Sequence, residues 1–268
     1  MRFMRPSSGL PDIADDSIIA WDIRSDATEL FRRWARETAD EELSGQLMWG
    51  CRRGEINQNE TTASSKQTSN NWKLAPAYNN RRYAEWGHNG VCNGQWVPYK
   101  TATLRDGSHG MMQAGISGKT KEGAWSITVA GKSEYDDRDE GDDLWYTGTK
   151  GNPLAHSKDT ELLITAKTKN KEVRVIRAGR ETGTESIYSP PFGFRYDGLY
   201  RVVDYKMVDP SISHYQFHLR RIPGQDPIRY QGVERRPTDQ ELMHMDRLKK
   251  QFGDSGLKGI EHIVQRRR

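Results

Sequence analysis

Apolar residues in the first eighty positions follow helical spacing in one clear stretch. Residues 25–39 carry them three and four positions apart, after a Ser-Asp pair that is typical of a helix start, so we predict an amphipathic helix there. A second short helix is predicted over residues 41–49. Residues 55–71 are almost wholly polar, which predicts a linker or a disordered loop. The apolar positions of the first helix are Leu30, Phe31, Trp34 and Ala35.

From Tyr83 onward the pattern changes to short β-prone runs separated by glycine-containing turns. Strands this short and this closely spaced predict a twisted barrel or sandwich mixed with a few helices. Residues 160–167 form a candidate helix, although their Leu-Leu-Ile-Thr run also fits a strand. Residues 238–252 are helical in spacing, with Gly253 as the stop. The strand candidates are residues 125–129, 173–177, 199–203 and 215–219.

These changes in the sequence pattern divide the chain into three parts. Residues 1–80 are predicted to be a helical extension with a polar linker, and residues 81–236 a β-rich domain. Residues 237–268 are predicted to be a basic C-terminal helix and tail.

Several protein classes are excluded by composition. Apolar runs reach only about four residues, too few to cross a membrane. The first ten residues lack the apolar stretch of a signal peptide. Cys51 and Cys92 are the only two cysteines, which excludes a disulfide framework and a cysteine-based zinc site and favours a reducing, intracellular protein.

Charge is distributed unevenly along a chain whose net charge is +4. Residues 229–268 hold ten Lys or Arg against six Asp or Glu, which suits an acidic partner such as nucleic acid or simply a solvated helix end. Residues 134–143 hold seven acids and one Arg. Such a run repels phosphate, so it must face away from a nucleic acid or contain a residue with a specific task.

Enzyme signatures are weak. The sequence Gly118-Lys119-Thr120 resembles the end of a phosphate-binding loop, but Gln113 stands where that loop needs glycine. The histidines match no zinc-hydrolase pattern. We therefore expect no catalytic residue, metal, cofactor or small-molecule substrate. One alternative stays open, because Asp197, Asp204 and Lys206 have the order of a Mg²⁺-dependent nuclease site.

The acidic run and the residues that follow it place a carboxylate between two tyrosines, Tyr135 and Tyr146. Aromatic rings stack on a planar base, which contributes about 1–3 kcal/mol per base. A carboxylate such as Asp137 accepts a hydrogen bond from an exocyclic amine such as cytosine N4. It must stay ionised to do so, with Arg138 or backbone donors as the compensating groups. An ordinary acidic surface loop is the alternative.

An ordered series of short motifs resembles one known family, the SET- and RING-associated domain, also called the YDG domain. The resemblance covers roughly residues 83–236, and it is the order and spacing of the motifs that make it specific. The motifs are Trp86-Gly87-His88, Gly90-Val91, Gly94, Trp96, Arg105-Asp106-Gly107 with His109, Ala114-Gly115-Ile116-Ser117-Gly118, Gly123-Ala124-Trp125-Ser126, Val129-Ala130-Gly131, Asp136-Asp137, Gly141, Tyr146-Thr147-Gly148, Val173-Arg174-Val175-Ile176-Arg177, Tyr188-Ser189-Pro190 and Arg195-Tyr196-Asp197-Gly198-Leu199-Tyr200-Arg201-Val202-Val203.

The resemblance implies an α+β fold: a PUA-like, crescent-shaped, partly open β-barrel flanked by helices, here with an N-terminal helical extension. It also implies a function without catalysis. Such domains bind methylated cytosine in double-stranded DNA, usually 5-methylcytosine in CpG, by flipping the base out of the duplex. A nuclear, chromatin-associated reader follows, with no membrane partner.

The resemblance also assigns roles to residues of the flipped-base pocket. Tyr146 matches a stacking tyrosine, Asp137 the carboxylate at the Watson–Crick edge, and Thr147 the residue beside the methyl group. Tyr135 matches the second stacking tyrosine, with a spacing to Gly141 one residue shorter than the family pattern.

Four further positions match the surroundings of that pocket. Ala130 and Gly131 match its backbone wall, Gly115 allows a close backbone approach, and Gln113 matches the residue that fills the gap left in the DNA. Phosphate contacts are expected from the basic tail and from Lys119, Lys121, Lys150 and Lys158.

One departure from the family concerns the loop after Tyr146-Thr147-Gly148. Residues 149–159 are short and lack the Asn-Lys-Arg finger of members that read hemimethylated DNA, so no hemimethyl preference is expected. The chain resembles the small stand-alone proteins of fungi. Two alternatives remain: the specificity module of a modification-dependent endonuclease, and a scaffold that has lost its pocket.

Overall fold

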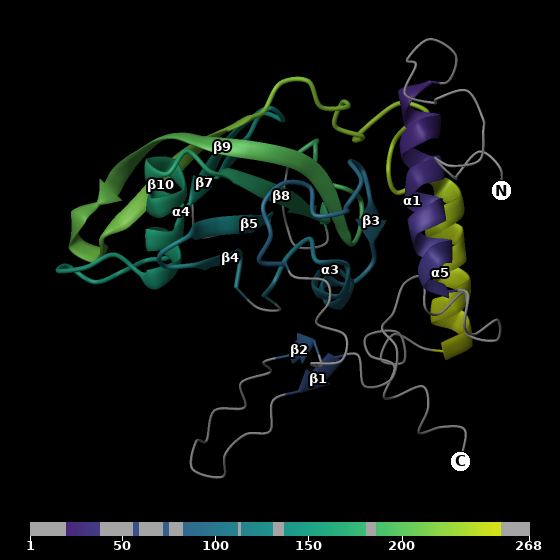
Figure 1. Cartoon of the computed structure of the whole chain (residues 1–268), viewed down its shortest axis with the longest axis horizontal. Helices are drawn as coiled ribbons and strands as arrows, with labels where there is room; N and C mark the ends of the chain where they lie inside the picture. Colours follow the sequence, from purple (N-terminus) through teal and green to yellow (C-terminus); the bar gives the residue numbers. More distant parts are fainter. Residues whose placement is uncertain are drawn as a thin grey trace.

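The molecule is built on one mixed β-sheet (Figure 1). The computed structural model describes residues 20–37, 56–58, 72–74, 83–111, 114–130, 137–180 and 186–252. The sheet order is β4-β5-β8-β9-β10-β7-β6, with β3 pairing β9. The strands are β3 (Trp96–Val97), β4 (Ile116–Lys119), β5 (Gly123–Val129), β6 (Arg138–Asp139), β7 (Asp143–Thr147), β8 (Glu172–Ala178), β9 (Phe194–Asp209) and β10 (His214–Arg221).

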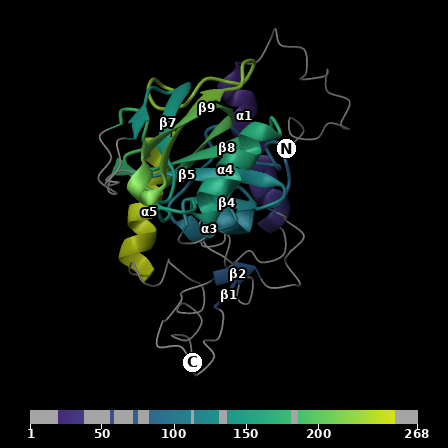
Figure 2. The ribbon, with the colours of Figure 1, turned by 90° about the vertical axis from the view of Figure 1, so that its left-hand side faces the viewer.

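The centre of the sheet is buried on both faces. All seven residues of β5 are buried, and β5 pairs with β8 in parallel while the other pairings are antiparallel. Continuous burial of this kind is typical of parallel strands with covered faces. Helix α4 (Lys158–Thr168) lies against the sheet beside β4 and β5 (Figure 2). Its Leu163 and Ala166 belong to the main hydrophobic core.

The candidate helix at residues 160–167 is confirmed as α4. Ser157 caps the N-terminus of α4, because the Thr160 N–H donates to Ser157 Oγ at 3.1 Å. Strand candidates 125–129, 173–177, 199–203 and 215–219 are confirmed within β5, β8, β9 and β10. Strand β9 is much longer than predicted, with sixteen residues, and it ends where Pro210 begins a short 3-10 turn.

Helices α1 (Trp21–Glu37) and α5 (Asp239–Phe252) flank one end of the sheet, away from α4 (Figure 1). Arg236 joins them, since its guanidinium donates to Glu29 Oε2 at 2.9 Å and also contacts Glu241. Both predicted helices are confirmed, and α1 begins four residues earlier than expected. In the part of the chain that the structure describes, no helix is long and apolar enough to cross a membrane.

Several sequence-based expectations need correction or stay open. Part of the predicted linker is a strand, because β1 (Ile56–Gln58) pairs with β2 (Trp72–Leu74). Helix α3 (Lys100–Asp106), which ends at Gly107 with φ 77°, was not predicted. The helix expected at residues 41–49 lies outside the described residues. The mixed sheet with flanking helices is confirmed, whereas closure into a barrel and the three-part division of the chain stay predictions.

Candidate nucleic-acid interface

Two residues predicted to contact a base meet at the end of the β6–β7 hairpin. Asp137 immediately precedes β6, and Thr147 is the last residue of β7. The Thr147 N–H donates to Asp137 Oδ1 at 2.7 Å. Of the two donors expected to support this carboxylate, the backbone group is therefore the one observed, and a backbone amide orients a carboxylate without cancelling its charge.

The Thr147 hydroxyl is a second polar group at this point. Its Oγ1 atom is buried and has no hydrogen-bond partner among the described residues. Leaving a buried hydroxyl unpaired costs about 1–3 kcal/mol, so such a group in a native structure needs an explanation. A ligand that pairs with Thr147 Oγ1 would supply one.

Tyr146 and Gly115 lie close together. Tyr146 is 7% exposed, and it belongs to a regular strand rather than to the loop that the sequence suggested. A Cβ atom built on Gly115 would lie 2.7 Å from Tyr146 Oη, which only a glycine avoids without a shift. Thr128 on β5 donates its N–H to the Gly115 carbonyl at 2.7 Å, and Ala130 directly follows the end of β5.

The other predicted site residues cannot be compared with the structure. Gln113, Gly131 and Tyr135 lie outside the described residues, as does the tail beyond residue 252. Among the lysines proposed to contact phosphate, Lys119 pairs with Glu122 at 2.6 Å.

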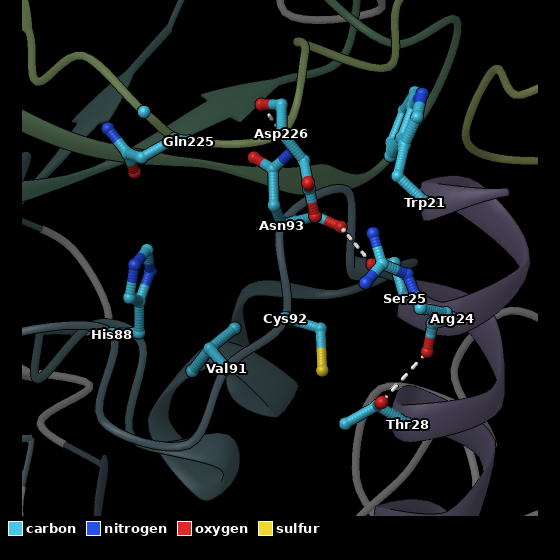
Figure 3. Close-up of a pocket in the computed structure, with 11 residues that line it drawn as sticks. Trp21, Arg24, Ser25, Thr28, His88, Val91, Cys92, Asn93, Gln225 and Asp226 are labelled. Carbon is cyan, nitrogen blue, oxygen red and sulfur yellow. Dashed lines mark hydrogen bonds between the residues drawn. The ribbon is translucent and has the colours of Figure 1, made fainter. Parts of the chain in front are cut away.

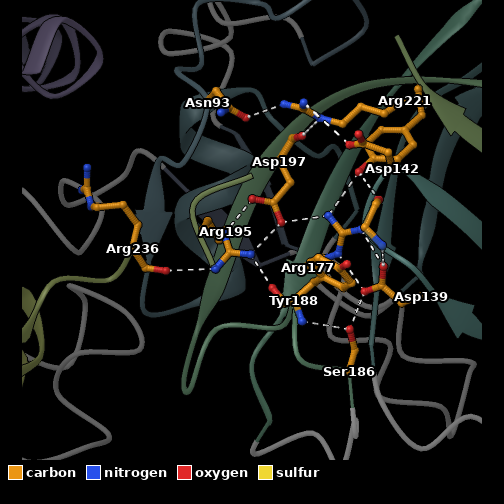
Figure 4. Close-up of polar contacts among 12 residues, drawn as sticks. Asn93, Asp139, Asp142, Arg177, Ser186, Tyr188, Arg195, Asp197, Arg221 and Arg236 are labelled. Carbon is orange, nitrogen blue, oxygen red and sulfur yellow. Dashed lines mark hydrogen bonds and ion pairs between the residues drawn. The ribbon is translucent and has the colours of Figure 1, made fainter. Parts of the chain in front are cut away.

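The residues of the acidic run have different structural roles. Asp139 is buried and receives two hydrogen bonds from the Arg177 guanidinium, at 2.7 and 2.8 Å (Figure 4). Ser186 Oγ adds a third bond at 2.6 Å. Burial by itself would raise the pKa of Asp139, but the charge and hydrogen bonds of Arg177 hold it below its ordinary value.

Exposed members of the run have partners of their own. Asp143 Oδ1 contacts His218 Nε2 at 2.6 Å and Arg220 Nε at 3.1 Å. Arg138, which the sequence offered as a partner for Asp137, instead pairs with Glu140 at 3.0 Å and lies over the Trp145 ring at 3.7 Å.

The proposed nuclease residues are not brought together. Asp197 is fully buried between Arg177 and Arg195, at 3.0 and 2.6 Å, while Asp204 and Lys206 lie exposed further along β9. Seven residues of strand separate the two acids by roughly 20 Å. Within the described ranges, no three His, Cys, Asp or Glu side chains are grouped so as to hold a metal ion.

Sequence reasoning missed two residues that contact the segment next to Gly115. Lys100 Nζ donates to the Ala114 carbonyl at 3.0 Å, and His109 Nε2 reaches the same oxygen at 3.0 Å. His109 was part of a quoted motif, but the motif did not indicate its contact. Nothing in the sequence around Lys100 distinguishes it from a surface lysine.

A separate cleft of about 510 Å³ lies between α1 and two loops of the β-rich domain (Figure 3). Trp21 and Arg24 line it from the helix, and Asn93 and Asp226 line it from the loops. Ser25 Oγ donates to the Asn93 carbonyl at 3.2 Å across this junction. Of the predicted base-contacting residues that the structure describes, none lines this cleft.

Comparison with known proteins identifies the family. The model of the SAD/SRA domain matches residues 85–225, more than half of the chain. A UHRF1-like protein from Cryptococcus neoformans var. grubii is 35% identical over 134 residues, 42% of this chain and 38% of that protein. The match thus covers well under half of the relative's length.

Two solved structures also resemble the chain. One is the modification-dependent TagI restriction endonuclease, 35% identical over 52% of both chains with a TM-score of 0.44. The other is SUVH5 SRA in complex with hemimethylated CG DNA, 31% identical over 51% of this chain and 92% of that chain with a TM-score of 0.41. By the extent of the family match, this chain belongs to the SAD/SRA domain family.

Proposed function

We propose that this chain is a non-enzymatic reader of methylated cytosine in double-stranded DNA. The observation that carries the proposal is the hydrogen bond from the Thr147 N–H to Asp137, because it holds a carboxylate at the end of the strand that carries Tyr146 and the buried Thr147 hydroxyl. Membership of the SAD/SRA family supports the same function.

In this proposal the base leaves the duplex and enters a pocket between Tyr146 and Tyr135. Asp137 accepts from cytosine N4, and Thr147 contacts the methylated edge. Gly115, Ala130 and Gly131 form the backbone wall, and Gln113 fills the gap in the DNA.

The energetics predict only a modest difference in affinity between methylated and unmodified DNA. Flipping costs a few kcal/mol of lost stacking and pairing, which the ring contacts and hydrogen bonds offset. Burying one methyl group adds about 1 kcal/mol. We therefore expect methylated DNA to bind roughly ten-fold more tightly than unmodified DNA. The preferred mark is 5-methylcytosine in CpG, and the protein acts in the nucleus with chromatin as its setting.

The test is fluorescence-polarisation binding to one CpG duplex in four states: unmodified, hemimethylated, fully methylated and hydroxymethylated. Ionic strength is held constant because phosphate contacts otherwise dominate. Preference for a modified duplex in the wild type, lost in Asp137→Asn, is the expected result. Asp142→Asn is the matched control, since this acid of the same run is exposed.

Equal binding of all four duplexes by the wild type would contradict the proposal and favour a scaffold without a working pocket. A metal-dependent cut in the methylated duplex would instead support the endonuclease alternative.

A further inference from the structure

A carbonyl next to the proposed pocket is held by two side chains that have no assigned role. The Ala114 carbonyl oxygen accepts from Lys100 Nζ and from His109 Nε2, each at 3.0 Å. Lys100 is the first residue of α3, and His109 lies in the segment after that helix. Two donors from different parts of the chain therefore fix one backbone group.

His109 is held on its other side as well. Its Nδ1 atom lies 2.8 Å from Ser126 Oγ on β5, and both residues are fully buried. Nε2 must carry a proton to donate to a carbonyl, and in the neutral ring Nδ1 then accepts from the serine hydroxyl. Burial lowers the pKa of His109 to about 3, which agrees with a neutral ring.

The fixed carbonyl directly precedes Gly115. The Gly115 carbonyl in turn accepts the Thr128 N–H at 2.7 Å, so this short segment is tied to α3, to His109 and to β5. Gly115 approaches Tyr146 so closely that an added Cβ would lie 2.7 Å from Tyr146 Oη. A shift of the Ala114 peptide by a few tenths of an ångström would therefore change the space beside that ring.

A lysine is a costly group to place here. Burial lowers the pKa of Lys100 to about 8, which shows that its surroundings disfavour the charge. Lys100 is nonetheless placed where one of its hydrogen bonds goes to the Ala114 carbonyl.

We propose that Lys100 and His109 are positioning residues that set the distance between Gly115 and Tyr146 and thereby the selectivity of the base pocket. They do not touch the base; they act through the Ala114–Gly115 backbone. The inference rests on the proposed reading of methylated cytosine.

The test compares Lys100→Met and His109→Gln with the wild type in full-length protein. Two quantities are measured: the ratio of affinities for methylated and unmodified duplexes, and the fluorescence of 2-aminopurine placed next to the target cytosine, which reports base flipping. We expect the roughly ten-fold ratio to fall to about two-fold or less in both variants, with a reduced fluorescence increase. Lys100→Arg, which keeps a charged donor, should restore both readouts.

Lys119→Met is the control for a general loss of positive charge, because this lysine is exposed and pairs with Glu122. If Lys100→Met weakens binding to all duplexes equally, as Lys119→Met would, Lys100 is a phosphate contact and the inference is wrong. If the variants keep the wild-type ratio and lose only thermal stability, the role is structural and the inference is also wrong.

If the proposed reader function is wrong, the binding measurements differ from the outcomes just described. A wild-type protein that binds methylated and unmodified duplexes equally refutes the reader function itself, and the positioning role with it. A selective wild type with selective variants refutes the positioning role alone. Circular dichroism at the assay temperature confirms that each variant is folded, and His109→Gln tests the inference by itself if Lys100→Met does not fold.

Discussion

Asp137 and Asp139 stand two residues apart in the same acidic run, yet the fold uses them differently. Asp139 is buried against Arg177, with two guanidinium bonds, a serine hydroxyl and the Gly141 N–H on its carboxylate. Asp137 is held by the backbone N–H of Thr147 at the end of the hairpin. An arginine balances the charge of its carboxylate, whereas a backbone amide only orients it. Asp139 is therefore a structural acid within a buried ion-pair network, whereas Asp137 lies at the end of the hairpin that carries Thr147.

The Asp139 region is part of a larger buried network. Arg177 also donates to Asp197 and to the Gly141 carbonyl, and Arg195 completes the pairing of Asp197 (Figure 4). Buried charges of this kind are stable only when every partner is present. The Asp137 region contrasts with it, because the Thr147 hydroxyl there is buried without a partner among the described residues.

The largest expected effect comes from breaking the network. Arg177→Met should lower the free energy of unfolding by about 3–5 kcal/mol, because Asp139 and Asp197 lose a shared buried partner. Urea denaturation measures the change. Arg138→Met is the control, since its pair with Glu140 is exposed and is expected to contribute about 0–1 kcal/mol. A loss of similar size in both variants would refute the structural role of the buried network.

A smaller effect on stability is expected from a change of pH that acts on His109. This residue is buried, and it hydrogen-bonds to the segment beside the proposed pocket. Its pKa is about 3 in the folded protein and near 6.5 when unfolded, so only the unfolded chain takes up a proton between these values. The stability from His109 is thus complete above pH 6.5 and falls with decreasing pH, by about 1.4 kcal/mol per pH unit. Urea denaturation at pH 7 and pH 5 measures it.

The comparison that isolates this effect is His109→Gln, which does not titrate. The drop in stability between pH 7 and pH 5 should be about 2 kcal/mol smaller in this variant than in the wild type. Equal drops in both proteins would show that His109 does not stay neutral in the fold.

The smallest effect on stability is expected at Thr147, where the change in binding should be larger. Thr147→Val removes the unpaired hydroxyl at nearly constant volume, so the free energy of unfolding should stay the same or rise by up to about 1 kcal/mol. Affinity for methylated DNA should fall about three- to ten-fold if the hydroxyl pairs with the base. A clear loss of stability would show instead that Thr147 Oγ1 has a structural partner, and the contrast with Asp139 would weaken.

The sequence alone was sufficient for features that depend on local pattern. Apolar spacing predicted α1 and α5, alternation predicted the main strands, and ordered motifs indicated the family. Local pattern could not predict α3, whose seven residues carry no clear apolar stripe, or the pairing of β1 with β2 across a polar segment.

The tertiary structure decided which members of each charged cluster have which task. Asp137 and Asp197 had site roles in the sequence analysis, and Asp139 belongs to the same acidic run as Asp137. The packing of Arg177 and Arg195 shows that Asp139 and Asp197 are buried ion-pair partners. Lys100 and His109, which meet at the Ala114 carbonyl, are a more local case. Partners that are far apart in the chain, such as Asp139 and Arg177, are set by long-range packing. The residue types alone therefore offered several acids near an aromatic residue, and the fold determined which of them pair with buried arginines.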